Sequence, residues 1–227
     1  MMKISYGIIC FFILMVVGVF ITESFSKSGE EPNDAFLAAI YEKDFIRMEK
    51  LLKNGVDINA PIREGLSPLA EAAFLGDLEV VNFLLSKGAS VEGTRYLPNS
   101  PMYFAIIGNN RGVVERFLNL GISPQYAWPD GGGTLLTAAV DSGHLDIVEL
   151  LIQRGADVNS SGKGNYSPLY RAIFSDFYQI CKLLLGTGAC LSERDKVVLS
   201  EMGWDRLKEN KKYINLLEKG RRCKKGK

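Results

Sequence analysis

The sequence is poor in the residues that most often carry out catalysis or bind metal ions. It has one histidine, His144, among 227 residues, and its four cysteines have no metal-binding spacing. General-base catalysis needs a nucleophile and an orienting group assembled around the base, and a lone histidine does not supply them. We therefore predict that the protein is not an enzyme and that it uses no catalytic residue, no metal and no cofactor.

Two further patterns fall short of a chemical site. The run of glycines before Thr134, residues 131–133, resembles a phosphate-binding loop at a helix start. The lysine of that motif is missing, however, and no buried strand precedes the glycines. Acidic residues of the same region are spread over solvated helix and loop positions, which does not suit a metal cluster. The function should therefore come from a surface that binds.

The overall composition is that of a folded chain with an uneven charge distribution. Hydrophobic residues make up 47% and charged residues 23%, which is typical of globular and repeat proteins. The net charge of +1 hides an asymmetry, because residues 205–227 contain ten Lys or Arg and three Asp or Glu. The body of the chain is thus mildly acidic and its C-terminal tail is basic.

An apolar run without charge extends over fifteen residues, from 7 to 21, after Lys3. Fifteen is the upper end of a signal-peptide core and is short of the roughly 20 residues that span a bilayer. Ser24 and Ser26 form a poor cleavage site, so residues 1–26 are either a cleaved signal peptide or a retained signal anchor. Both alternatives predict export, to the periplasm or to an inner-membrane anchor facing outward. Residues 27–32 are expected to be a linker.

Cysteine usage leaves a single disulfide open. Cys10 lies in the apolar run, which leaves Cys181, Cys190 and Cys223. Three cysteines do not form a disulfide framework, although one bridge between two of them is possible. The alternative for Cys181 is a small apolar residue buried on a helix.

Between these termini the sequence repeats with a period of 33 or 34 residues. Five glycines suited to the left-handed end of a helix lie 33, 33, 34 and 33 positions apart. A good N-cap residue stands 21 positions before each glycine, and proline follows three of these N-caps, as expected at the first helical position. Each unit therefore predicts two short helices, opened by Asp34, Ser67, Ser100, Thr134 and Ser167 and closed by Gly55, Gly88, Gly121, Gly155 and Gly188.

This unit resembles the ankyrin repeat. The resemblance rests on Ser-Pro-Leu at 67–69 and 167–169, on residues 143–151 and on Gly-Ala-Asp-Val-Asn at 155–159. It implies an all-α solenoid of five helix-turn-helix units, joined by hairpin loops called fingers and closed by a C-terminal helical cap. We assign the repeats to residues 33–60, 61–93, 94–126, 127–160 and 161–191, the capping helices to 192–220 and a basic disordered tail to 221–227.

The sequence departs from the family pattern at one position in each of the second to fifth units. The histidine that usually follows Thr-Pro-Leu is replaced by Ala70, Tyr103, Thr137 and Tyr170. This change puts the usual buried hydrogen-bond network between repeats in doubt, but not the fold. The resemblance places His144 in the turn between two helices, where a structural role is implied.

The resemblance also implies a binding surface on the concave side, made by the fingers and the exposed ends of the first helices. The residues at these positions are unusually apolar for a surface, and tyrosine and tryptophan are strong contributors to interfaces. Tyr126 and Trp128 are the strongest candidates, whereas Leu66, Leu97 and Ile107 could instead belong to the core. The predicted partner-binding residues are Tyr41, Leu66, Phe74, Leu75, Tyr96, Leu97, Ile107, Tyr126, Trp128, Asp130, Tyr166 and Phe174.

Two functional hypotheses follow. The first is an exported, bacterial-type repeat protein that binds another protein in a stoichiometric complex, for example as an inhibitor or immunity protein against a secreted toxic enzyme. The second is a membrane-tethered scaffold or protective partner in the cell envelope, held by residues 7–21 and by the basic tail. Export disfavours nucleic acid as the partner of that tail. We expect a monomer when no partner is bound.

Overall fold

The computed structural model describes residues 31–62, 65–92, 100–128, 133–162 and 166–201. Within these ranges the chain forms eleven helices and no strand. The expected signal segment, most of the linker and the basic tail lie outside the described residues. The helices are α2 (Pro32–Glu42), α3 (Phe45–Lys53), α4 (Pro68–Leu75), α5 (Leu78–Ser86), α6 (Pro101–Ile107), α7 (Arg111–Asn119), α8 (Leu135–Asp141), α9 (Leu145–Gln153), α10 (Pro168–Phe174), α11 (Tyr178–Gly186) and α12 (Glu193–Glu201).

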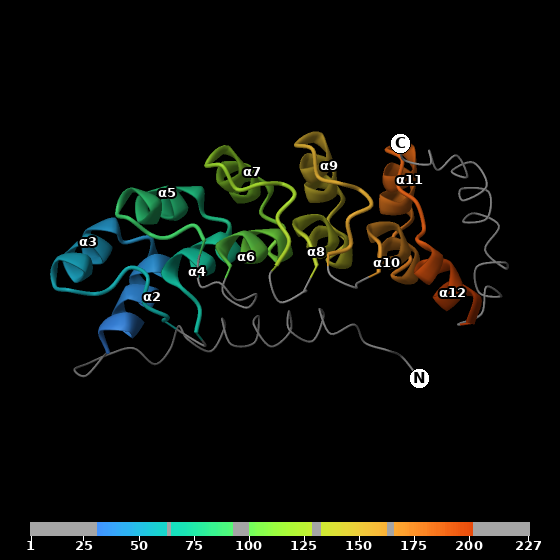
Figure 1. Ribbon diagram of the computed structural model, residues 1–227. Coiled ribbons are helices and arrows are strands. Elements are labelled where there is room, and N and C mark those ends of the chain that lie inside the picture. The colour runs from blue at the N-terminus through green and yellow to red at the C-terminus, as the bar shows by residue number, and fades with distance from the viewer. Residues whose placement is uncertain (1–30, 63–64, 93–99, 129–132, 163–165, 202–227) are drawn as a thin grey trace.

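The helices stack as antiparallel pairs in two rows (Figure 1). The first helix of each pair, α2, α4, α6, α8 or α10, lies in one row, which we call the inner row. The second helices, α3, α5, α7, α9 and α11, form the outer row, and each helix packs on its own partner and on the next helix of its row. This arrangement confirms the all-α solenoid of five helix pairs predicted from the period.

Local capping explains where the inner helices begin. The hydroxyl oxygens of Ser67, Thr134 and Ser167 each accept a hydrogen bond of 3.2 Å from the backbone N–H three residues later, and Ser100 makes the same bond at 3.5 Å. Each bond satisfies an N–H that has no partner within its helix. The four predicted N-caps are therefore confirmed.

The predicted N-cap of the first repeat is wrong. Helix α2 begins at Pro32, two residues before Asp34, and Glu31 takes the N-cap position without a side-chain hydrogen bond. The fixed φ of proline suits the first helical position, so Pro32 extends the helix backward. Asp34 instead lies in the first turn, where its negative charge is favourable near the positive end of the helix dipole.

The five closing glycines are required by backbone conformation. Their φ angles lie between 93° and 99°, in the left-handed region that side chains disfavour. A Cβ atom added at any of them would meet no atom within 4 Å, so space does not select glycine there. The chain turns at these positions from the outer helix into the loop that leads to the next repeat.

A ladder of side-chain amides links the loops of successive repeats. The Oδ1 atom of Asn59 accepts from the Ser90 N–H at 2.7 Å, and that of Asn159 accepts from the Cys190 N–H at 2.8 Å. Gln125 accepts from the Asp157 N–H and donates to the Gly155 carbonyl. Register puts Glu92 at the same position of the second repeat, where a carboxylate cannot donate to a carbonyl.

Replacing Glu92 with asparagine is expected to stabilise the protein. Asparagine can both accept from the next loop and donate to a carbonyl there, so the broken step of the ladder would be restored. We expect the free energy of unfolding to rise by about 0.5–1.5 kcal/mol, the usual net value of such a bond. Urea unfolding of wild type and Glu92→Asn measures the change. Glu92→Ala is the control, because the alanine side chain can neither accept nor donate a hydrogen bond. Equal stability of the asparagine and alanine variants would contradict the ladder.

One continuous core fills the space between the two rows. Its largest fully buried side chains include Phe36, Met48 and Phe117, and Cys181 on α11 is also fully buried. Cys181 is a free thiol, as the second alternative for it predicted, whereas Cys190 is disulfide-bonded. Burial raises the pKa of the Cys181 thiol to about 12, with a smaller contribution from Asp176.

Cys181 is expected to resist alkylation in the folded protein. At a pKa of about 12 against an ordinary 9.0, its thiolate fraction near pH 8 falls roughly a thousandfold, and the core also excludes the reagent. Iodoacetamide labelling followed by peptide mapping should modify Cys181 only after denaturant is added. Rapid modification of Cys181 in buffer would show that the last repeat opens readily, which the packed core does not predict.

Candidate functional site

The inner row carries a group of exposed apolar side chains. Of the nine exposed large hydrophobic residues in the described part of the chain, Tyr41, Leu75 and Phe174 lie at the C-terminal ends of inner helices, and Tyr126 precedes α8. Phe174 is 59% exposed and Leu75 44%. All four are among the predicted binding residues. The other five, on the outer row, in the loop after α7 or on α12, are Ile46, Leu78, Leu120, Leu145 and Val197.

The repeat register aligns one position of every inner helix. Counting by 33 or 34 residues brings Tyr41, Phe74, Ile107, Asp141 and Phe174 to the same place on α2, α4, α6, α8 and α10. Tyr41, Asp141 and Phe174 are exposed and the other two are half-buried. Because the outer row covers the opposite side of these helices, the aligned side chains lie on the uncovered side. We call this side the inner-row surface.

Trp128 lies in the core and not on the exposed surface where it was predicted. It was expected to contact a partner directly, but only 3% of its side chain is exposed. The ring packs edge-on against Tyr103 at a centroid distance of 5.7 Å and against Tyr126 at 6.0 Å. Its backbone N–H also donates to the Gly133 carbonyl, which closes the base of the finger. Trp128 is therefore a core residue of the finger, and Tyr126 is the exposed member of the pair.

Trp128 extends an aromatic chain that crosses three repeats. Phe74 packs edge-on against Phe104 at 6.2 Å, and Phe104 packs in the same way against Tyr103 at 5.7 Å. Tyr103 then contacts Trp128, which contacts Tyr126. Edge-to-face pairs of this kind add about 0.5–1.5 kcal/mol beyond buried area. The exposed rings at this side of the solenoid are thus held on a rigid base.

A second aromatic group lies on the last repeat. Tyr166, Tyr170 and Phe174 stack along α10, with centroids 4.3 Å apart for the first pair and 6.0 Å for the second. Tyr166 is half-buried and Tyr170 is buried, so Phe174 is the exposed end of the stack. Arg194 of α12 lies over the Tyr166 ring at 5.1 Å, close enough for a cation–π contact.

An ion pair separates the two aromatic groups. Arg171 of α10 donates through Nη1 to Asp141 Oδ2 of α8 and through Nε to the carbonyl of Tyr166. Desolvation by the surrounding residues raises the pKa of Asp141 although its side chain is 47% exposed, and the neighbouring Arg171 counteracts part of this effect. The pair gives the inner-row surface one polar position between two apolar ones. Such a pattern favours a partner segment with mixed apolar and polar side chains.

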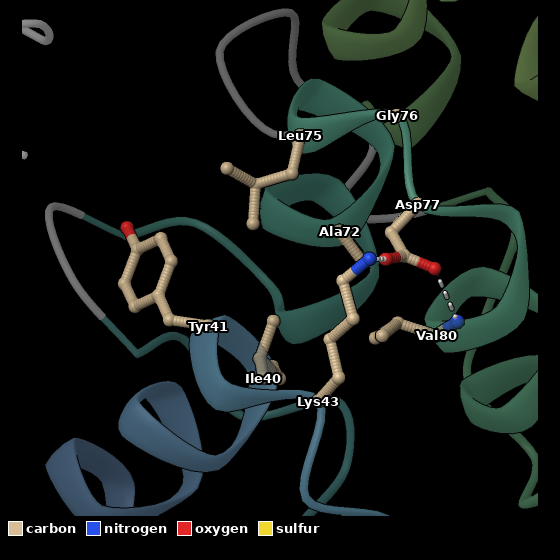
Figure 2. A pocket seen from close by; sticks show the side chains of 8 residues that line it. All are labelled: Ile40, Tyr41, Lys43, Ala72, Leu75, Gly76, Asp77 and Val80. Atoms are coloured by element: carbon tan, nitrogen blue, oxygen red, sulfur yellow. Dashed lines mark hydrogen bonds and ion pairs between the residues drawn. The ribbon is translucent and has the colours of Figure 1, made fainter.

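A pocket of about 310 Å³ lies between the C-terminal ends of α2 and α4 (Figure 2). Tyr41 and Leu75 face the same space from α2 and α4, while Lys43 reaches toward Asp77. The remaining lining residues are Ile40, Ala72, Gly76 and Val80. Two predicted binding residues, Tyr41 and Leu75, thus belong to one concave feature. The prediction did not include the charged pair beside them.

The charged pair in this pocket is well defined. The Lys43 ammonium forms an ion pair with Asp77 Oδ2, and Asp77 Oδ1 accepts from the N–H groups of Glu79 and Val80 at the start of α5. Burial alone would raise the pKa of Asp77, but Lys43 and the two N–H donors outweigh it and lower that pKa. Asp77 is therefore an ionised N-cap. Lys43 remains 60% exposed, and its contact with Asp77 raises its own pKa.

Glu71 is a functional candidate that the sequence reasoning missed. This residue of α4 is only 8% exposed, and its Oε1 atom accepts a 2.5 Å hydrogen bond from the Tyr41 hydroxyl. Among the described residues no cation forms an ion pair with it. A signal was available, because Glu71 is the one charged residue in the otherwise apolar segment 68–75.

His144 and its counterparts join the repeats rather than forming a reactive site. The Nε2 atom of His144 lies 3.2 Å from the Ile107 carbonyl of the preceding inner helix. One repeat earlier, Asn110 donates from Nδ2 to the carbonyls of Ala73 and Phe74. These bonds satisfy carbonyl groups at the ends of inner helices, which have no partner within the helix. The structural role implied for His144 matches this contact.

Two of the remaining predicted binding residues are half-buried, and three are not described by the structure. Leu66 and Ile107 are half-buried, while Tyr96, Leu97 and Asp130 lie outside the described residues. In the ranges that the structure covers, no group of three or more His, Cys, Asp or Glu is arranged to hold a metal ion. Within the same ranges, none of the helices combines the length and apolarity needed to cross a bilayer.

The sequence of this chain matches one protein family over most of its length. Residues 35–126 and 102–195 each match the family described as ankyrin repeats (3 copies). The two matches overlap and together extend over more than half of the chain. They span all five helix pairs of the structure.

Relatives of this chain include proteins of a virus and of animals. The ankyrin repeat protein FPV031 of fowlpox virus (strain NVSL) is 30% identical over 159 residues, which cover 64% of this chain and 47% of that protein. A second fowlpox protein, FPV223, is 26% identical over 139 residues, 61% of this chain and 96% of that protein. The transient receptor potential cation channel subfamily A member 1 homolog of Caenorhabditis elegans is 27% identical over 132 residues, 58% of this chain and 11% of that protein. The aligned region thus spans about half of the first relative's length, and none of these three proteins supports the expected bacterial type.

Proposed function

The chain belongs to the ankyrin-repeat family, and we propose that it acts by forming a stoichiometric complex with another protein held on the inner-row surface. Ankyrin repeats are protein-binding modules, and the proposal concerns which surface binds and in what setting. The observation that carries it is the exposure of Tyr41, Leu75, Tyr126 and Phe174 on one side of the solenoid. Large exposed apolar side chains that gather on one side of a protein often mark a surface that binds a partner.

The two aromatic groups support this choice of surface. Phe174 is exposed at the end of a stack of three rings, and Tyr126 at the end of a chain of five. Rings fixed by their neighbours lose little conformational freedom when a partner docks, which favours binding. The Asp141–Arg171 pair between them would select against a purely apolar partner.

We place the complex outside the cytoplasm. The apolar run at residues 7–21 suits an export signal, and the disulfide at Cys190 suits an oxidising compartment. In that setting the protein would serve as an inhibitor or immunity protein that occludes a secreted toxic enzyme. The second candidate is a membrane-tethered scaffold, which retention of residues 1–26 and the basic tail would favour.

Site-specific photo-crosslinking in cells tests the proposed surface. A photoreactive amino acid replaces Phe174 or Leu75 on the inner row in one pair of variants. In a matched pair it replaces Ile46 or Leu145, which are exposed on the outer row. We expect a discrete crosslinked species from the inner-row positions alone. Equal crosslinking from both rows, or crosslinking from the outer row only, would contradict the proposal.

The position of the mature N-terminus distinguishes a soluble exported protein from a membrane-tethered scaffold. Intact mass of the protein purified from its source would show a start near residue 25 or 27 for a soluble exported form. An intact Met1 would favour the tethered scaffold instead. A reducing, cytoplasmic fraction that contains all of the protein would contradict export.

A further inference from the structure

We propose that Cys190 forms its disulfide with Cys223, and that this bond holds residues 191–222 as a cap on the last helix pair. Cys190 is disulfide-bonded, whereas Cys181, on the helix before it, is a free thiol. The inference concerns the end of the solenoid and goes beyond the surface proposed to bind a partner. It rests on the proposed export at one step, which is the exclusion of Cys10.

Among the four cysteines, Cys223 is the partner that remains when the others are excluded. Cys181 is a free thiol whose side chain is fully buried on α11. Cys10 lies in the apolar run 7–21, which export would either remove or leave in the bilayer. In both cases Cys10 would be kept away from a loop of the folded repeats. A bond within one chain therefore joins Cys190 to Cys223.

The hydrogen-bonded ladder between loops shows how far along the chain a neighbour of Cys190 should lie. The Ser90 N–H donates to Asn59 Oδ1, and these two residues are 31 positions apart. The Cys190 N–H donates to Asn159 Oδ1 over the same separation of 31 positions. Loops that are one repeat apart in sequence thus lie side by side in space. Cys223 follows Cys190 by 33 positions, which is one repeat period.

The sequence after Cys190 predicts that the repeat period continues for one more unit. Gly220 follows the closing glycine Gly188 by 32 positions, one fewer than the usual separation of 33. Cys190 stands two residues after Gly188, and Cys223 stands three residues after Gly220. The two cysteines therefore occupy nearly equivalent places in successive loops. A unit of this length would bring the second loop back beside the first.

The bond would give the outer row the support that α12 gives the inner row. Helix α12 lies beside α10 (Figure 1) and is fixed to its start, because Asp195 accepts a 3.3 Å hydrogen bond from the Ser167 N–H. Cys190 lies in the loop directly after α11, the last outer helix in the described part of the chain. The last repeat of a solenoid needs a cap, because no further repeat covers its end. A covalent link at Cys190 would hold such a cap beside α11.

Formation of the bond is an oxidation that the proposed compartment can supply. Each Sγ–H group loses one proton and one electron, and one Sγ–Sγ bond forms. A disulfide-bearing oxidant, such as oxidised glutathione or an oxidised thiol–disulfide exchange protein, takes up the two electrons and two protons and becomes two thiols. Cys190 is half-buried in a loop, whereas Cys181 is fully buried and out of reach of such an oxidant.

Peptide mapping of the full-length protein locates the bond. Protein purified with a reductant is oxidised with oxidised glutathione, and its free thiols are then blocked with iodoacetamide in denaturant. Trypsin separates Cys181 from Cys190 by cleaving after Lys182. We expect one peptide pair that joins Cys190 to Cys223 and comes apart when a reductant is added. A bond from Cys190 to Cys10, to Cys181 or to a second chain would overturn the proposal, as would two free thiols.

Oxidation of the purified protein also separates this test from the proposed function. The pairing is measured without export and without a partner protein, so a protein that is not exported would still form the expected peptide pair. Conversely, a different pairing would leave crosslinking at the inner-row surface unaffected.

Serine variants test the capping role by urea unfolding. Cys223→Ser and Cys190→Ser should each raise the equilibrium constant for unfolding about a hundredfold under oxidising conditions, because the bond closes a long loop in the unfolded chain. The double variant should be as stable as either single variant, and all three should match wild type when a reductant is present. Cys10→Ser is the matched control, with no expected change. Additive losses in the double variant, or the same losses in reductant, would overturn the proposal.

Hydrogen exchange shows where the cap acts. In Cys223→Ser the amides of α12 and of the loop after α11 should exchange faster than in wild type, while those of α4 and α6 stay unchanged. Unchanged exchange in α12 would overturn the proposal that the bond holds a cap on the last helix pair.

Discussion

Replacement of Trp128 by alanine is expected to lower the free energy of unfolding by about 3–5 kcal/mol, the largest effect of any single change proposed for this chain. The ring is 3% exposed and lies between Tyr103 and Tyr126, so its removal leaves a cavity at the junction of the third and fourth repeats. Each repeat of a solenoid depends on its neighbours, and a cavity at an internal junction weakens both sides. Urea unfolding followed by circular dichroism measures the loss.

Trp128→Phe separates packing from hydrogen bonding. The indole Nε1 atom is the one buried side-chain nitrogen or oxygen without a hydrogen-bond partner in the described part of the chain. An unpartnered buried donor costs about 1–3 kcal/mol, and phenylalanine removes that cost while it leaves a smaller cavity. We therefore expect Trp128→Phe to be much less destabilising than Trp128→Ala. A phenylalanine variant as unstable as the alanine variant would mean that Nε1 finds a partner in the native protein.

Replacement of Asp195 by alanine is expected to cost about 2–4 kcal/mol and to release α12, the last helix in the described part of the chain. The carboxylate is fully buried, and it accepts from the N–H groups of Ser192 at 2.8 Å and Ser167 at 3.3 Å. The first bond caps α12, and the second fixes that helix to the start of α10. Hydrogen bonds to a charged acceptor contribute about 1.5–3 kcal/mol each, so losing both exposes the end of the solenoid.

Hydrogen exchange resolves the effect of Asp195→Ala by position. Amides of α12 and of α10 should exchange faster, while those of α4 and α6 should stay protected. Asp195→Asn retains an acceptor oxygen and should lose less stability than the alanine variant. Uniformly faster exchange across all repeats would contradict a local capping role, as would unchanged exchange in α12.

The starts and ends of the helices could be predicted because they depend on residues that are close together in sequence. A serine N-cap acts on an N–H three residues away, and a closing glycine acts on its own φ angle, so Ser67 and Gly88 were correctly identified from spacing. Asp34 was placed wrongly because Pro32, two residues earlier, begins the helix instead. The start of α12 has the same kind of local cause, since the Ser192 hydroxyl accepts from the Asp195 N–H.

Contacts between repeats could not be predicted from one sequence. The burial of Trp128 depends on Tyr103, which is 25 positions away, and apolar composition alone does not distinguish an exposed ring from a packed one. The pocket likewise needs Lys43 and Asp77 from different repeats. Register could have brought Tyr41 and Phe74 to one face, but it gives no side-chain direction, and the contact of Tyr41 with Glu71 depends on that direction.

Calorimetric titration of the crosslinked partner, once it is identified, tests most directly whether that protein binds the inner-row surface in a stoichiometric complex. The proposed inner-row surface predicts one-to-one binding to wild type. It also predicts a loss of affinity of about a hundredfold for the Leu75→Ser, Phe174→Ser double variant, whose two side chains are exposed and should not affect stability. The matched outer-row double variant, Ile46→Ser, Leu145→Ser, should bind like wild type. Unchanged affinity of the inner-row variant with weakened binding of the outer-row variant would show that the partner binds the outer row instead.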